Sequence, residues 1–129
     1  MSIALGLLII RVVVGLMFAG HGVQKLFGWF GGYGLKGTGS WMDSIGLKPG
    51  VLVALLAGLA ELAGGLLFVL GFWMIPAAVL IVLTMLGAII SVHRKNGFWV
   101  TQNGMEYNIV LIAVAIGLAL IGAGEYAIG

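Results

Sequence analysis

The sequence predicts an all-α membrane protein, a polytopic four-helix bundle with up-down-up-down topology. Two observations carry this prediction: 62% of the residues are hydrophobic while only 8% are charged, and four apolar runs are long enough to span a bilayer. A soluble domain carries about 25% charged residues. Six Lys/Arg and four Asp/Glu are too few to cover a water-facing globule, and there is no cysteine. The composition therefore excludes a soluble enzyme and a disulfide scaffold.

A single transmembrane domain, residues 1–129, is expected. About 20 helical residues cross the roughly 30 Å hydrocarbon core. The expected spans are residues 3–27, 51–70, 76–92 and 105–121. The long loop 28–50 is expected to hold a short interfacial helix at residues 40–45. Asn103 followed by Glu106 predicts a capping box for the fourth helix.

The basic residues predict the orientation of these spans. Lys25, Lys36 and Lys48 lie in or beside the first loop, and Arg94 and Lys95 lie in the third. The N-terminus, the second loop and the C-terminus carry no Lys or Arg. The positive-inside rule places loops one and three in the cytoplasm and both termini outside. Because the basic residues flank apolar runs, no nucleic-acid partner is expected.

Two charges, Arg11 and Glu61, lie deep in the apolar runs. A charge at mid-bilayer costs about 2.5–3.5 kcal/mol on insertion scales. Arg11 precedes Lys25 by 14 residues, roughly 21 Å of helix, and Glu61 follows Pro49 by 12, roughly 18 Å. If Lys25 and Pro49 mark the same interface, the two charges lie at similar depth. The sequence therefore predicts an Arg11–Glu61 ion pair, facing the small residues of a compact bundle.

This pair has two interpretations. A matched pair of charges can be purely architectural and fix the helix register. Alternatively, Glu61 is a proton acceptor or a ligand contact that Arg11 tunes. No catalytic residue is assigned on either interpretation. The small residues Ala113 and Gly117, four apart, indicate a face that could support a homo-oligomer.

A second polar group is expected at the cytoplasmic mouth of the bundle. Its members are His21, Lys25, His93, Glu106, Tyr107 and Asn108. Two histidines on separate helices could ligate haem or a metal ion, but their spacing is not diagnostic, and no metal is assigned. A pocket for the polar head of a quinone or another lipid-like ligand is the preferred interpretation.

Three blocks of the sequence resemble the DoxX family of small bacterial membrane proteins. They are Arg11…Gly15…Phe18…His21-Gly22…Lys25-Leu26, Gly58…Glu61…Gly64-Gly65…Leu70-Gly71 and Asn103-Gly104…Glu106-Tyr107-Asn108. The blocks occur in order over essentially the whole chain. The resemblance implies a four-helix protein of the bacterial inner membrane with redox associations, because the family is named after a subunit linked to thiosulfate:quinone oxidoreductase and terminal oxidase complexes.

Three functions remain open from the sequence. The first is a redox-associated subunit that binds a quinone and is at most part of a quinone-linked oxidoreductase. The second is a non-catalytic anchor or assembly partner that holds an oxidoreductase through the first loop. The third, a minor alternative, is a small proton-coupled transporter. In small multidrug exporters the essential carboxylate lies in the first span, whereas this chain has Arg11 there.

Overall fold

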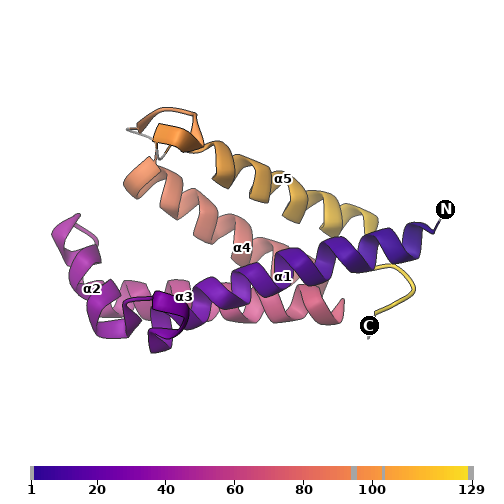
Figure 1. Ribbon diagram of the computed structural model, residues 1–129, viewed down its shortest axis with the longest axis horizontal. Coiled ribbons are helices and arrows are strands. Elements are labelled where there is room, and N and C mark those ends of the chain that lie inside the picture. The colour runs from indigo at the N-terminus through magenta and orange to yellow at the C-terminus, as the bar shows by residue number, and fades with distance from the viewer. Residues whose placement is uncertain (1, 94–95, 103, 128–129) are drawn as a thin grey trace.

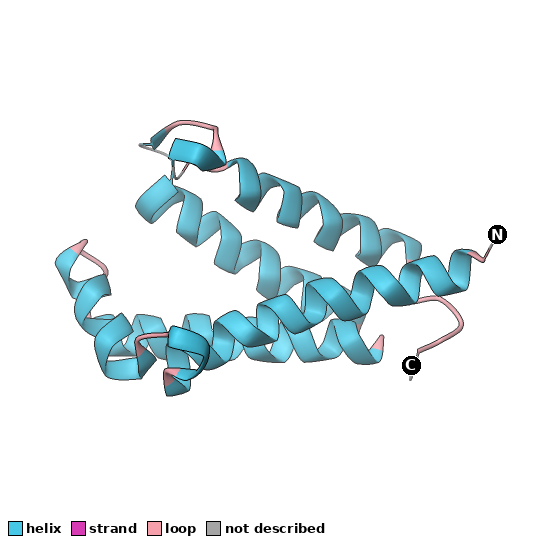
Figure 2. Ribbon diagram, viewed as in Figure 1, coloured by secondary structure: helices cyan, strands magenta, loops and turns pink. Residues whose placement is uncertain are grey.

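The computed structural model describes residues 2–93, 96–102 and 104–127, without the side chains of residues 92, 93 and 100. The described residues form helices and no strands (Figure 2). The helices are α1 (Ile3–Phe27), α2 (Gly34–Ser44), α3 (Gly50–Leu70), α4 (Met74–Ala88) and α5 (Glu106–Ile121). Shorter turns are the 3-10 helices η1 (Trp29–Gly31) and η4 (Val100–Gln102), and the π-helical η2 (Ile89–His93) that extends α4.

Three of these helices, α1, α3 and α4 with its extension to Ser91, are long and apolar enough to cross a membrane. The apolar helix α5 is shorter, with 16 residues. The helix ends follow local chemistry. Ser2 accepts a hydrogen bond from the Leu5 N–H at the start of α1, and Gly28 ends that helix at a φ of 77°. Such a left-handed terminal residue is usually glycine because it lacks a Cβ.

Among the described helices, α1 and α3 pack against each other most extensively (Figure 1). A Cβ on Gly22 would lie 2.7 Å from the Gly58 oxygen, and one on Gly15 would lie 2.5 Å from the Gly65 oxygen. The glycines let the two backbones touch, as small residues do between helices in lipid. Their order shows that α1 and α3 run antiparallel and fixes their register.

Helix α4 packs against both α3 and α5, and the α4–α5 pair is inclined to the α1–α3 pair (Figure 1). The core between them is apolar, with Phe18, Phe68 and Ile81 almost completely buried. Both chain ends lie near the same end of the molecule, where α1 begins and α5 ends (Figure 1). Helix α2 and the turn η1 lie toward the other end.

The short helix of the first loop is longer than the sequence indicated. Helix α2 begins at Gly34, six residues before the expected start at Ser40. Glycines disfavour a helix by about 1 kcal/mol each, which is why the pattern did not extend it. Tertiary contact overrides this preference. A Cβ on Gly39 would lie 2.9 Å from the Val51 backbone, so the glycines let α2 cross the start of α3 closely.

Asp43 links α2 to α3, because its Oδ1 accepts a hydrogen bond of 2.8 Å from the Gly50 N–H. Asp43→Ala leaves this N–H of the first α3 turn without its partner. We expect a loss of about 1 kcal/mol of unfolding free energy, the usual value of a helix cap. Asp43→Asn keeps an acceptor oxygen and serves as the matched control. Thermal unfolding in detergent compares the two, and equal loss in both would contradict the capping role.

Candidate functional site

Glu61 lies on the face of α3 that contacts α1, and its carboxylate is buried. Its Oε1 is 2.5 Å from the Lys25 Nζ, with the Glu61 side chain 3% and the Lys25 side chain 26% exposed. Side chains on a helix tilt toward its N-terminus. In this antiparallel pair, Lys25 therefore reaches inward and Glu61 reaches toward the loop end, so their charges meet between the two helices.

The expected Arg11–Glu61 ion pair is not formed. Arg11 is fully buried, but its guanidinium donates to the carbonyl oxygens of Ala123 (2.6 Å), Tyr126 (2.7 Å) and Val69 (3.4 Å). The bond to Val69 places Arg11 opposite the end of α3. That level is eight residues beyond Glu61, or roughly 12 Å along the helix. The two charges thus belong to different ends of the molecule.

Lys25 also lines an open hollow of about 570 Å³ beneath η1 and α2. The lining residues are Gln24, Lys25, Gly31, Gly32, Tyr33, Gly37, Thr38 and Trp41. A volume of this size is typical of small-molecule sites. The lining includes an ammonium group, an amide, a hydroxyl and two aromatic side chains. Glu61 balances the charge of the ammonium group through the ion pair.

Gln24 lines this hollow and makes two side-chain hydrogen-bond contacts. The Gln24 amide nitrogen donates to the Phe30 carbonyl oxygen at 3.1 Å, and its Oε1 lies 3.2 Å from His21 Nδ1. Phe30 has a φ of 55°, a left-handed conformation that is uncommon for a bulky residue. The Gln24 bond holds the η1 turn in this conformation. His21 itself is exposed and does not line the hollow.

The remaining members of the expected mouth cluster are distributed over other contacts. Tyr107 donates from its hydroxyl to the Met17 sulfur on α1 at 2.6 Å. The buried Asn108 amide lies 3.5 Å from the Met85 sulfur, and its Oδ1 has no hydrogen-bond partner among the residues that the structure describes. Glu106 starts α5. The His93 side chain, Arg94, Lys95 and the expected capping residue Asn103 lie outside the described residues.

Of the expected site residues, the structure therefore brings Lys25 and Glu61 together. Sequence reasoning missed Gln24, Tyr33, Thr38 and Trp41. Gln24 carried a usable signal, because it is an amide beside a lysine at the end of an apolar run. Thr38 and Trp41 carried none, since their approach to Lys25 depends on the path of the first loop.

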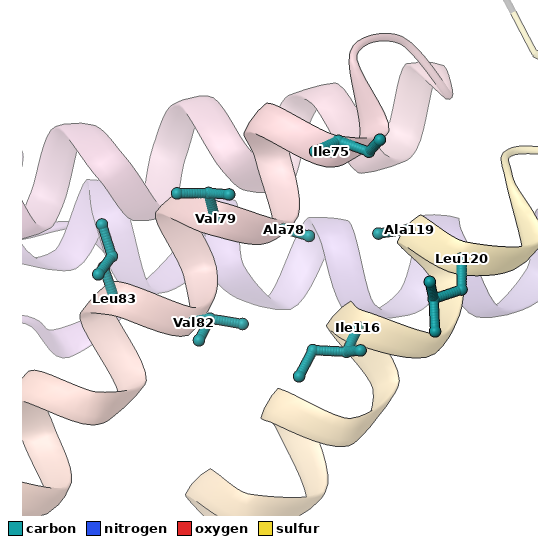
Figure 3. A pocket seen from close by; sticks show the side chains of 8 residues that line it. All are labelled: Ile75, Ala78, Val79, Val82, Leu83, Ile116, Ala119 and Leu120. Carbon is teal, nitrogen blue, oxygen red and sulfur yellow. The ribbon is translucent and has the colours of Figure 1, made fainter.

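A second hollow, of about 380 Å³, lies between α4 and α5 and is lined by hydrocarbon alone. Figure 3 shows the side chains of Ile75, Ala78, Val79, Val82, Leu83, Ile116, Ala119 and Leu120 around it. With no polar group, it cannot orient a polar head. The hollow beside Lys25 is therefore the candidate functional site.

This geometry defines a class of protein. It is a small helical membrane protein with a partly buried Lys–Glu ion pair beside a polar and aromatic hollow. The pattern of the DoxX family matches residues 6–94, and the chain belongs to that family. The chain is 35% identical over 122 residues to "Putative oxidoreductase CatD" of Bacillus subtilis (strain 168), covering 95% of this chain and 83% of that protein. It is 32% identical over 123 residues to "Inner membrane protein YphA" of Escherichia coli (strain K12), covering 92% and 84%. No solved structure matches the chain significantly.

Proposed function

We propose that this protein is a redox-associated membrane subunit that binds a quinone, or a similar lipid-soluble ring compound, in the hollow beside Lys25. The observation that carries the proposal is the position of the buried Lys25–Glu61 pair at the wall of that hollow. A quinone ring presents two carbonyl oxygens that accept hydrogen bonds. Lys25 and Thr38 supply donors, and Tyr33 and Trp41 supply faces that pack on a flat ring.

The pair also fits the charge change of the reaction. Reduction of a quinone to a quinol takes two electrons and two protons. The Lys25 ammonium group stabilises negative charge on the reduced oxygen before the protons arrive, and Glu61 holds this ammonium group in position through the ion pair. The electrons come from a partner oxidoreductase, because the cysteine-free sequence has no ligand set for an iron–sulfur cluster. The name of the relative CatD supports this redox role.

We further propose that α1, α3, α4 with η2, and α5 all cross the bacterial inner membrane, as the name of the relative YphA suggests. Loops one and three then face the cytoplasm and both described chain ends face outward. The lysines of the first loop support this orientation. The hollow would lie at the cytoplasmic interface, where a quinone head can meet a soluble partner while its tail stays in lipid.

A quinone titration in nanodiscs tests this function. The wild-type protein is titrated with decylubiquinone, followed by Trp fluorescence, after a check for quinone and haem that co-purify. Thr38→Val removes the hydroxyl of the hollow and keeps its shape. We expect a roughly fivefold weaker affinity, since one hydrogen bond contributes about 1 kcal/mol. Thr84→Val is the matched control, because Thr84 lies on α4 and donates to the Leu80 carbonyl.

Glu61→Gln is expected to weaken binding further than Thr38→Val, whereas His21→Ala acts only through Gln24 and has a smaller effect. Absence of saturable binding by the wild-type protein would overturn the proposal. If the Thr38 and Thr84 variants bound the quinone with equal affinity, the ligand would not lie in this hollow. The protein would then be better explained as a membrane anchor for an oxidoreductase, bound through the first loop.

A further inference from the structure

The end of the molecule away from the hollow holds a buried cation. Arg11 and Gln24 are 13 residues apart on α1, roughly 20 Å. The two short hydrogen bonds of Arg11 go to the carbonyl oxygens of Ala123 and Tyr126. Both residues belong to the strap, by which we mean residues 122–127 after α5. Figure 1 shows the strap folding back beside the start of α1.

Arg11 has no carboxylate partner among the described residues. The ion pair between Lys25 and Glu61 lies toward the other end of the molecule. Glu125 lies in the strap but is exposed and does not pair with Arg11. Within the described part of the chain, the Arg11 guanidinium meets neutral carbonyl groups, and its buried Nε has no hydrogen-bond partner there. Carbonyl dipoles do not cancel a full charge in apolar surroundings, so an anion would be bound more strongly there than in water.

The strap covers Arg11 without being part of a helix. Gly122 and Gly124 have φ angles of 94° and 85°, which take the chain out of α5 and back toward α1. Besides the two Arg11 bonds, the strap packs on α1 through Gly124, whose Cβ position lies 3.1 Å from Leu7. It also packs on the end of α3, where a Cβ on Gly71 would lie 2.6 Å from the Ala127 Cβ and 3.0 Å from the Ala123 Cβ, and Ala123 packs against the core. Releasing the strap would break no helix and would free both terminal nitrogens of the guanidinium from their short hydrogen bonds, leaving the longer bond to Val69. That planar pair of donors matches the two oxygens of a carboxylate or phosphate.

We propose that Arg11 is the centre of an oxyanion-binding site and that the strap occupies this site when no anion is bound. The ligand is a phosphate-type oxyanion, supplied by a phospholipid headgroup or by free phosphate at this end of the bundle. Binding of the anion and release of the strap are then coupled. This site is separate from the hollow and does not depend on the quinone proposal.

Thiol labelling of the strap tests the coupling, because the chain has no cysteine of its own. Ala123→Cys places a thiol at a half-buried position of the strap that packs against the core, and Ile75→Cys is the control. Ile75 is 66% exposed at the start of α4, at the same end of the bundle. Labelling rates with a charged maleimide are compared in phosphatidylcholine nanodiscs, in nanodiscs with phosphatidylglycerol, and in phosphatidylcholine nanodiscs with inorganic phosphate.

We expect Ala123→Cys labelling to rise at least fivefold with phosphatidylglycerol if a headgroup is the ligand, or with phosphate if a free anion is. The labelling rate of Ile75→Cys should stay the same when either anion is added. Adding Arg11→Gln should make labelling fast and independent of the anion, and Arg11→Lys, which keeps the charge but lacks the paired donors, should weaken the response. The proposal would be overturned if the labelling rate of the strap cysteine changed with neither anion, or if the labelling rate of the Ile75→Cys control rose by the same factor.

Discussion

Lys25→Met is expected to lower the free energy of unfolding by about 3 kcal/mol, the lower end of the range for breaking a buried ion pair. The reason is asymmetric burial. Lys25 is 26% exposed, whereas Glu61 is 3% exposed. Without Lys25, the Glu61 carboxylate stays buried without its counter-charge. Without the Glu61 charge, Lys25 can turn its ammonium group toward the hollow and the interface. Glu61→Gln should therefore cost only about 1 kcal/mol.

Reversible denaturation in bicelles measures these differences, and the double variant Lys25→Met/Glu61→Gln completes a thermodynamic cycle. We expect the double variant to be more stable than Lys25→Met, because the uncompensated charge is gone. Lys36→Met is the control, since Lys36 is an exposed lysine on α2, and it should change stability by no more than about 0.5 kcal/mol. A Glu61→Gln loss equal to that of Lys25→Met would contradict the asymmetry.

The positions of the long helices could be predicted from hydrophobicity alone, because the apolar runs end at helix-stopping residues. The run expected at 3–27 is α1, and the run expected at 51–70 is α3, which starts one residue earlier. Helix α4 starts at Met74, before Pro76, because a proline in the first helical turn displaces no hydrogen bond. The π-helical turn at Ile89–His93 had no such signal.

The pairing of the buried charges could not be predicted in the same way. The depth estimate assumed that Lys25 and Pro49 lie at one level. The contacts of Gly22 with Gly58 and of Gly15 with Gly65 show a different register, in which Lys25 lies level with about residue 55. Pro49 is six residues further along, roughly 9 Å. Helix α2 packs against the start of α3, and this first part of α3 extends beyond the end of α1. Because the offset depends on this tertiary contact, the sequence pattern did not indicate it.

Gly65→Ala is the second substitution with a large expected effect, because it acts on this register directly. Its Cβ would overlap the Gly15 carbonyl oxygen and lie 2.6 Å from the Ala19 nitrogen. Both neighbours are backbone atoms of α1, so no side chain can turn aside. The two helices would have to separate, and overpacking of this kind costs about 1–3 kcal/mol. We expect the upper part of that range in bicelle denaturation.

Gly20→Ala separates this effect from helix propensity, because it makes the same change on α1 where no atom lies within 4 Å of the Cβ position. We expect Gly20→Ala to be neutral or to raise stability by up to about 1 kcal/mol. Gly65 is also one turn from Glu61, so separation of the helices would pull the carboxylate away from Lys25 and weaken the proposed quinone binding as well. Equal stability of the two alanine variants would mean that α1 and α3 do not touch along their backbones, and the register that joins Lys25 to Glu61 would lose its basis.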